Sequence, residues 1–413
     1  MIIKKLSFKN FKSFSSSSAL QNLQNFDILT LIYGENNSGK SNILKFIDLL
    51  FRSKKGYDTS FTLDSGIQLL PSGESPFWTG IITNDSFMFH KNNRKLVIEF
   101  DITLSFYLSE INGLEGFKSL QKHYNLRKNS CNINLKGIIE SLEDPFESEI
   151  TLRSVELNEI EIFKNENGLK KYYGGIINKS PELEIGTFED LLSILNDCVV
   201  FLDHNRFLKN EKESENIIEL SPSNFKNWLH NLTLDPFEYP KFIEFISFIK
   251  LNSISGNSGK VLNQFEPTFS RTNGIIDVLL KSGNFRLPLN SYGTGIMQII
   301  LILASIFESK SKIILIEELE LNLSPKSQQE LLQILNNLIK NKRIHQVIFT
   351  SHSNTLAKTA SIPLYEVELS SGGISEVKFH KVADESFYEI NPTISKEINS
   401  GVREHGVMGP EWE

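Results

Sequence analysis

The N-terminal part of the chain contains two alternating stretches and one continuous apolar stretch. Apolar residues recur among polar ones between Ile3 and Phe8, and residues 95–107 alternate in the same way. This period of two is typical of strands with one buried face, so we predict strands here, the first at a sheet edge. Phe26–Tyr33 is largely apolar and ends at Gly34, which predicts a strand buried on both faces.

The C-terminal third shows strand-like and helix-like patterns in turn. Short apolar runs predict strands at 312–316 and 346–350, and apolar spacing of helical period predicts helices at 42–51, 296–307 and 327–339. Residues 363–369 and 374–380, on either side of a Ser-Gly-Gly turn, predict a hairpin. Strands that alternate with helices imply a parallel sheet covered by helices, and therefore an α/β fold.

The middle of the chain is less regular. Residues 56–93 are rich in Gly, Pro, Ser and Asp and are interpreted as irregular connections, and residues 400–413 have no periodicity and are interpreted as a tail. Helical patterns occur near 188–195 and 237–251, without heptads, so we expect no long coiled coil. We therefore predict an N-terminal lobe, a large insertion that is mainly helical or α/β, and a C-terminal lobe: 1–107, 108–285 and 286–413.

Composition places the chain among folded proteins and leaves the nucleic-acid question open. Of its 413 residues, 40% are hydrophobic and 23% charged, which argues against disorder. A net charge of −7 does not indicate a globally basic protein, although a local basic groove is compatible with it. Cys131 and Cys198 are far apart in sequence, which fits a reducing cytosol and excludes a cysteine zinc site. The first residues lack a signal-peptide pattern, and the apolar run Ile299–Phe307 is too short for a membrane span, so we expect a cytoplasmic protein.

A glycine-rich loop with a phosphate-binding pattern joins the apolar strand to the first helix. Gly34-Glu-Asn-Asn-Ser-Gly39-Lys40-Ser41 matches G-x-x-x-x-G-K-[ST]. Backbone N–H groups of such a loop surround phosphates, Lys40 reaches the β- and γ-phosphates, and Ser41 binds Mg²⁺. The alternative is a chance loop of similar composition. The predicted nucleotide-binding residues of this loop are Gly34, Glu35, Asn36, Asn37, Ser38, Gly39, Lys40 and Ser41.

Two adjacent acids follow the strand predicted at 312–316. Ligands of open α/β sheets bind at the C-terminal edge of the strands, where Glu317 and Glu318 are expected to lie. Glu317 would hold Mg²⁺ through water, and Glu318 would orient or deprotonate the attacking water. Alone, such a pair more often belongs to a turn that starts a helix, but together with the glycine-rich loop it favours catalysis.

Two further segments are candidates for phosphate contact. Ser291, Gly293 and Gly295 precede the helix predicted at 296–307 and resemble an anion site at a helix N-terminus, with an ordinary N-capped helix as the alternative. His352, at the end of the strand predicted at 346–350, is a candidate sensor of the γ-phosphate, although single histidines are more often structural. Arg206 could approach phosphate, but a surface salt bridge is the preferred interpretation.

Taken in order, these motifs resemble the ABC-type P-loop ATPases of the SMC, RecF and OLD group. Gly34–Ser41 is similar to their Walker A motif, Ser291–Gln298 to their signature, Ile313–Glu318 to their Walker B motif and His352 to their switch histidine. The resemblance implies a mixed sheet flanked by helices, ATP and Mg²⁺ as ligands, ATP hydrolysis, and an ATP site shared between two copies of the chain.

The OLD-like branch fits best, with departures. Leu319 stands where that branch has proline, Asn322 and Ser324 stand where it has histidines, and only Gln68 offers a weak candidate for the Q-loop glutamine. About sixty residues follow His352, without the Asp-x-Asp pattern of the Toprim nuclease domain. The chain therefore resembles stand-alone ATPase subunits of bacterial anti-phage systems, such as PtuA of Septu or AriA of PARIS.

Three functional hypotheses follow. The first is an ATPase switch that dimerises or forms a higher oligomer and controls a separate effector, a nuclease or toxin, in anti-phage defence. The second is a RecF-like repair ATPase that binds DNA directly. The third is a nucleotide-dependent scaffold that does not hydrolyse ATP.

Overall fold

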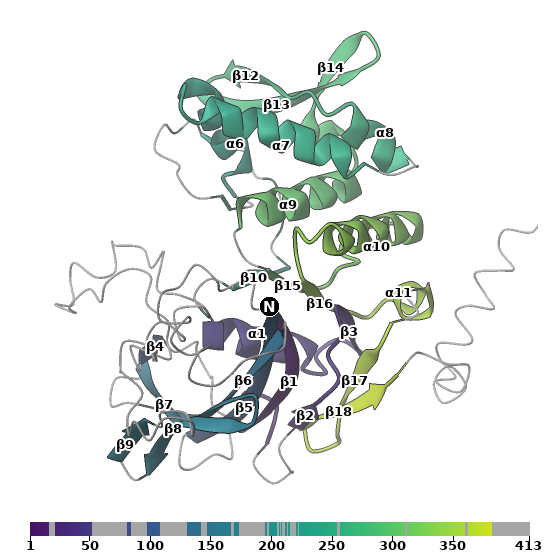
Figure 1. Cartoon of the computed structure of the whole chain (residues 1–413). Coiled ribbons are helices and arrows are strands. Elements are labelled where there is room, and N and C mark those ends of the chain that lie inside the picture. The colour runs from purple at the N-terminus through teal and green to yellow at the C-terminus, as the bar shows by residue number, and fades with distance from the viewer. Residues whose placement is uncertain are drawn as a thin grey trace, which may run out of the picture.

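The structure is a computed structural model of the chain. It describes residues 1–15, 21–51, 81–83, 97–107, 130–141, 147–166, 169–172, 195, 198–204, 206, 208, 211–212, 214, 220–221, 223–253, 257–309, 312–359 and 362–381. Within these residues the elements stack in layers, with one large sheet at one end and a small sheet at the other (Figure 1). Among the described helices, none is long and apolar enough to cross a membrane.

The first layer is an antiparallel sheet with order β2-β1-β5-β6-β7-β8-β9, in which β4 also pairs with β7. Its strands are β1 (Ile2–Lys9), β2 (Gln21–Leu23), β4 (Ile81–Thr83), β5 (Val97–Tyr107), β6 (Ser130–Ser141), β7 (Glu147–Leu157), β8 (Ile160–Glu166) and β9 (Leu169–Tyr172). The strand predicted first is confirmed, but its predicted edge position is wrong. β1 lies between β2 and β5, because the short segment at Gln21–Leu23 pairs with its outer side.

The central sheet has order β10-β15-β16-β3-β17-β18, and all neighbours are parallel except β17 and β18. Its strands are β3 (Leu29–Tyr33), β10 (Val199–Leu202), β15 (Ile313–Ile316), β16 (Gln346–Ser351), β17 (Leu364–Leu369) and β18 (Ser375–His380). The predicted strands and the predicted C-terminal hairpin of this region are confirmed. The expected α/β fold with a mixed sheet flanked by helices is therefore confirmed.

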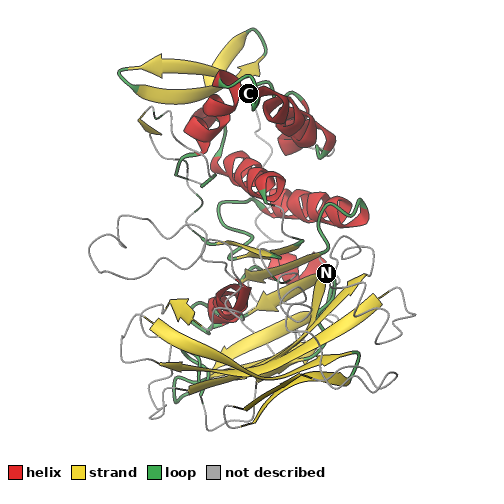
Figure 2. Cartoon of the chain, turned by 60° about the vertical axis from the view of Figure 1, so that its left-hand side comes forward, coloured by secondary structure: helices red, strands yellow, loops and turns green. Residues whose placement is uncertain are grey.

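Both faces of the central sheet are covered, which explains why its strands are so largely apolar. On β15, Ile313 and Leu315 pack with α1 (Lys40–Phe51) and the large antiparallel sheet in one core. Ile314 and Ile316 point to the other face and pack in a second core with α9 (Thr294–Glu308) and α10 (Pro325–Lys340). Successive residues of a strand point to opposite faces, so a strand buried on both faces needs apolar residues throughout. Figure 2 shows the two sheets and the helices above them as successive layers.

Beyond α9 lies a smaller lobe of helices and strands (Figure 1). Its helices are α6 (Phe225–Leu234), α7 (Tyr239–Leu251) and α8 (Asn257–Asn263), and its strands are β11 (Glu211–Lys212), β12 (Thr268–Thr272), β13 (Ile275–Ser282) and β14 (Phe285–Pro288). The 3-10 turn η2 (Leu289–Ser291) leads from β14 into α9, and α11 (Asn354–Thr359) follows β16.

Of the two alternatives predicted for residues 108–285, the mainly helical one is wrong for the described part of the segment, which contains both strands and helices. Strands β6–β9 extend the first sheet, β10 joins the central sheet, and among the described residues of the segment only α6–α8 are helical. The segment thus contributes to all three sheets, while the proposed division at 107 and 285 stays a prediction. The helix predicted near 188–195, most of the irregular stretch at 56–93 and the tail at 400–413 lie outside the described residues.

Candidate functional site

The loop between β3 and α1 has the backbone conformation that a phosphate-binding loop needs. Gly39 has φ +104°, and a Cβ at this position would lie 2.3 Å from Ser375 Oγ and 2.7 Å from Ser13 Oγ. Only glycine tolerates both the dihedral angle and this close approach. The hydroxyl of Ser375, on β18, donates a 2.6 Å hydrogen bond to the carbonyl oxygen of Ser38, and its oxygen lies 2.7 Å from Ser13 Oγ. The β17–β18 hairpin therefore supports the loop from behind.

Lys40 is folded over this loop. Its Nζ donates hydrogen bonds of 2.8 Å to the carbonyl oxygen of Gly34 and 2.5 Å to that of Glu35, and the residue is 6% exposed. Burial lowers the pKa of Lys40, and the nearby carboxylates of Glu320 and Glu318 partly oppose this effect. An ammonium group that is poorly hydrated and held by carbonyl oxygens is well placed to bind a phosphate.

Glu317 lies at the C-terminal end of β15, directly opposite α1. Burial alone would raise its pKa, but hydrogen bonds from Ser41 and His204 outweigh burial and lower the pKa below its usual value. His204 Nδ1 lies 3.2 Å from Glu317 Oε2. Glu317 is therefore a carboxylate at neutral pH, next to a serine hydroxyl at the start of α1. Hard oxygen donors of this kind fit Mg²⁺, so Ser41 and Glu317 would hold the cation together with phosphate oxygens.

Glu318 has a backbone conformation that is uncommon for residues other than glycine. Its φ is +49°, in the left-handed region. The Glu318 N–H donates a 2.8 Å hydrogen bond to Thr350 Oγ1, and its carbonyl oxygen accepts a 3.0 Å bond from Arg206 Nη2. Such a conformation costs roughly 1 kcal/mol or more and is found where the surrounding structure enforces it, often at functional sites.

His352 follows β16 and is tied to the same edge of the sheet. Its Nδ1 lies 2.9 Å from Glu320 Oε1, and its backbone N–H donates a 2.6 Å hydrogen bond to the same oxygen. The hydrogen bond to Glu320 raises the pKa of His352. Burial alone would raise the pKa of Glu320, but the hydrogen bonds from His352 outweigh burial and lower it. The imidazole thus stays half exposed, with its other nitrogen outside this pairing.

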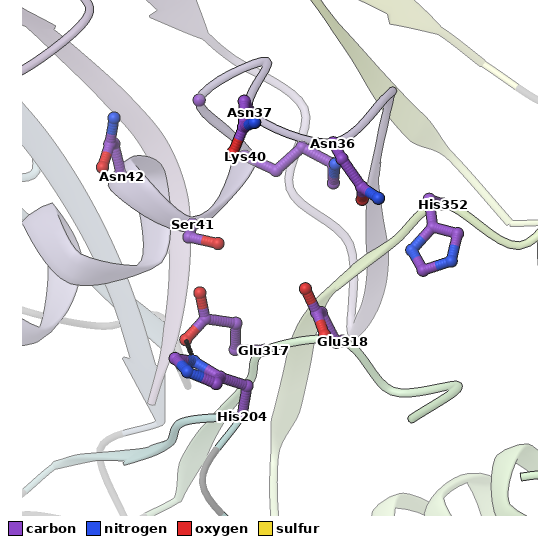
Figure 3. A pocket seen from close by; sticks show the side chains of 10 residues that line it. Asn36, Asn37, Lys40, Ser41, Asn42, His204, Glu317, Glu318 and His352 are labelled. Atoms are coloured by element: carbon purple, nitrogen blue, oxygen red, sulfur yellow. Dashed lines mark hydrogen bonds and ion pairs between the residues drawn. The ribbon is translucent and has the colours of Figure 1, made fainter. Parts of the chain in front are cut away.

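These groups face a common cavity of about 610 Å³ (Figure 3). The side chains come from separate parts of the sequence, and Glu317 and Glu318 point toward Ser41 and Lys40 across an open space. The residues that line the cavity are Asn36, Asn37, Gly39, Lys40, Ser41, Asn42, His204, Glu317, Glu318 and His352. A cavity that combines a buried lysine ammonium group, carboxylates and a glycine-rich loop is suited to a polyphosphate with a divalent cation.

The remaining predicted residues do not line this cavity. Gly34, Glu35 and Ser38 shape the loop behind it, through the Lys40 and Ser375 hydrogen bonds described above. Ser291 and Gly293 are exposed at the start of α9, and Gly295 is half-buried in its first turn. The structure therefore brings the loop, Glu317, Glu318 and His352 together and leaves the α9 segment outside the pocket of its own chain.

The segment after β10 adds one residue to the site and corrects one prediction. His204 lines the cavity, although no motif points to it. The interpretation of Arg206 as a surface salt bridge is wrong: the residue is 2% exposed and binds backbone carbonyls of Leu202, Glu317 and Glu318. The sequence signal for both residues is the short apolar run before Asp203, which is typical of a strand ending at the site. Gln68 lies outside the described residues.

Comparisons with known proteins agree with this geometry. A family model described as "AAA ATPase domain" matches residues 1–357. A comparison with curated proteins gives no match.

Three solved structures of SMC head domains are similar to this chain. The structure of the SmcHead bound to the C-winged helix domain of ScpA is 14% identical, with a TM-score of 0.50, and the match covers 94% of this chain and all of that one. An SMC head domain from Thermotoga maritima is 15% identical with a TM-score of 0.41, covering 92% of this chain and 100% of that one. A Smc head domain with an extended coiled coil, bound to the C-terminal domain of ScpA derived from Pyrococcus furiosus, is 14% identical with a TM-score of 0.42, covering 96% and 99% of the two chains. At 14% identity, the similarity to the SmcHead structure supports the fold alone.

Proposed function

Because the chain belongs to the AAA ATPase domain family, we propose that it binds ATP with Mg²⁺ in the cavity at Lys40 and hydrolyses ATP there. The observation that carries the proposal is the convergence of the glycine-rich loop, the two acids after β15 and His352 on one cavity. The loop is hundreds of residues away from the acids and the histidine in sequence. Their meeting at the C-terminal edge of a parallel sheet is an arrangement suited to phosphoryl chemistry.

Each side chain has a role that follows from its position. Lys40 would exchange its two carbonyl partners for oxygens of the β- and γ-phosphates. Ser41 and Glu317 would hold the cation, which neutralises charge on the phosphate oxygens when it is bound. Glu318 would orient or deprotonate the attacking water, and His352 would hydrogen-bond the γ-phosphate while Glu320 fixes its ring.

We further propose that two copies of the chain complete each other's ATP sites. The N-cap residue of α9, Gly293, provides no side-chain cap, and a Cβ added there would meet nothing within 4 Å among the described residues. The N-terminus of the helix therefore has no cap from its N-cap side chain and is sterically open beside Gly293, so it would attract an anion. Since Ser291 and Gly293 do not line the pocket of their own chain, the anion they meet would be the γ-phosphate held by Lys40 of a second copy.

The dimer would act as a switch on a separate effector, a nuclease or toxin, in anti-phage defence. This part of the proposal is supported by the resemblance of the motifs to OLD-like ATPase subunits, and it is tested by affinity capture of the chain from its native cell with and without ATP. Recovery of a nuclease or toxin only in the ATP-bound state would support it. Tight binding of DNA by the purified chain, with the salt dependence of phosphate contacts, would favour the RecF-like alternative instead.

Hydrolysis is tested with Glu318→Gln, which removes the base and preserves the size of the side chain. We expect MgATP affinity within about threefold of the parent and turnover lowered by about a hundredfold or more, in the range that general base catalysis contributes. Glu376→Gln, which changes an exposed acid on β18, is the control and should turn over ATP like the parent. Parental turnover by Glu318→Gln would exclude Glu318 as the base, and absence of turnover by the parent would favour the scaffold alternative.

A further inference from the structure

Arg206 is almost fully buried and makes an unusual set of contacts. The guanidinium donates to the backbone carbonyl oxygens of Leu202 at 3.2 Å, Glu317 at 2.8 Å and Glu318 at 3.0 Å, and also to that of Asp203. Its Nε donates to Gln298 Oε1 at 3.1 Å. The charge is thus placed at the end of the strand that delivers the two acids, without touching the cavity itself.

A buried guanidinium held by carbonyl oxygens is costly for the fold, because burial removes a permanent charge from water. A role limited to packing would be filled at lower cost by an apolar side chain of similar volume. What the guanidinium provides here is geometry: its fixed fork of donors holds two successive carbonyl groups, of Glu317 and Glu318, in one arrangement. One of these residues, Glu318, has the left-handed φ of +49°.

The other end of the contact is the helix proposed to meet the partner's nucleotide. Gln298 lies on α9, five residues after Gly293, and is 2% exposed. Its side-chain amide also donates to the backbone carbonyl of Arg206, so the two residues are joined by two hydrogen bonds. Through this pair, the start of α9 is connected to the catalytic acids within a single chain.

We propose that Arg206 and Gln298 are positioning residues that couple the N-terminus of α9 to Glu317 and Glu318, so that binding of the partner's nucleotide at α9 aligns the acids of the chain's own site. The proposal rests on the proposed function, namely ATP hydrolysis at a site shared between two chains. It differs from a catalytic role, because neither residue lines the cavity. It also differs from a packing role, because loss of the link would lower turnover and leave nucleotide affinity unchanged.

The test uses the full chain with Gln298→Leu, which removes the contact from the α9 side and leaves the carbonyl contacts of Arg206 in place. We expect kcat to fall about tenfold, within the usual range of coupling between sites, while KM and the affinity for MgATP change less than about twofold. Arg206→Lys, and the double variant with Gln298→Leu, complete a double-mutant cycle. If both residues act through one link, the double variant should be no slower than the slower single variant. Ser305→Ala, which removes a hydroxyl that binds Leu301 on the same helix, is the control and should keep parental kcat.

The outcomes separate this inference from the proposed function. Parental kcat in Gln298→Leu, or a fall in MgATP affinity equal to the fall in kcat, would overturn the coupling while ATP hydrolysis by the parent still stands. Fully additive losses in the cycle would also overturn it, because they would show two independent effects. An inactive parent chain would instead refute the proposed function on which the coupling rests.

Discussion

Replacement of Lys40 by methionine is expected to abolish most of the affinity for ATP and to change the stability of the empty chain little. Methionine is unbranched and fills a similar volume, so the packing around the side chain persists. In the empty chain the ammonium has two carbonyl partners but the residue is only 6% exposed, and its lowered pKa shows that burial opposes its charge. Loss of the two hydrogen bonds therefore lowers the free energy of unfolding, and removal of the buried charge raises it. The two contributions are equal to within about 1 kcal/mol.

The loss on ATP binding is larger, because no opposing effect remains. A hydrogen bond to a charged group contributes about 1.5–3 kcal/mol, and a loss of about 2.7 kcal/mol corresponds to roughly a hundredfold weaker affinity. At MgATP about one hundred times above the parental Kd, the ligand stabilises the parent by about 2.7 kcal/mol but the variant by only about 0.4 kcal/mol.

The assay is chemical unfolding with and without MgATP, supported by calorimetry of binding. Lys340→Met, at the exposed end of α10, is the matched control and should bind MgATP like the parent. Equal stabilisation of the parent and Lys40→Met by MgATP would refute the assignment of the loop. A loss of several kcal/mol in the empty variant would show that lost bonds and relief from burial do not offset each other.

Two further predictions concern the loop and the histidine. Gly39→Ala should lower the free energy of unfolding by about 1–3 kcal/mol and weaken MgATP binding, since the new Cβ would lie 2.3 Å from Ser375 Oγ. The control is Gly274→Ala, at φ +71° with nothing within 4 Å of the new Cβ. It should show only the cost of the backbone conformation and bind MgATP normally. The raised pKa of His352 implies stability that is fully present below its ordinary value of about 6.5 and is lost as pH rises through the raised value. The free energy of unfolding of the parent should therefore decline above pH ~6.5, and His352→Gln should remove this decline. An identical pH profile in both chains would contradict the pairing with Glu320.

The predictable parts of the molecule are those in which the determining residues are close in sequence. The loop at Gly34–Ser41 needs a buried strand before it, glycine at 39 and a helix after it, and all three are visible in one short stretch of the chain. The strand Ile313–Ile316 is similar, because burial on both faces leaves an apolar run that is not interrupted. Fold class and the core of the site follow from these two segments.

The parts that sequence does not predict depend on partners that are distant along the chain. Arg206 binds Gln298 and Glu317, which lie 92 and 111 positions away, and nothing near Arg206 in the sequence indicates them. The strand β6 is a different case, because its buried residues alternate with more exposed ones, and this period of two is visible in the sequence despite the helical expectation for the region. Pairing of β1 with Gln21–Leu23 is not predictable, since a three-residue strand has too few positions to show a period.

The most direct test of the central claim, that two chains share each ATP site, is the turnover of a mixture of two inactive variants. Lys40→Ala removes the charge of the phosphate loop, and Ser291→Arg blocks the start of α9, so each homodimer carries one defect in both of its sites. A mixed dimer places both defects in one site and leaves the other intact. Random exchange of equal amounts should restore about a quarter of parental ATPase activity if the two sites act independently. Recovery well below a quarter in chains shown to have exchanged would indicate that the two sites are coupled, as proposed for Arg206 and Gln298. Full activity of Ser291→Arg alone would contradict the shared site.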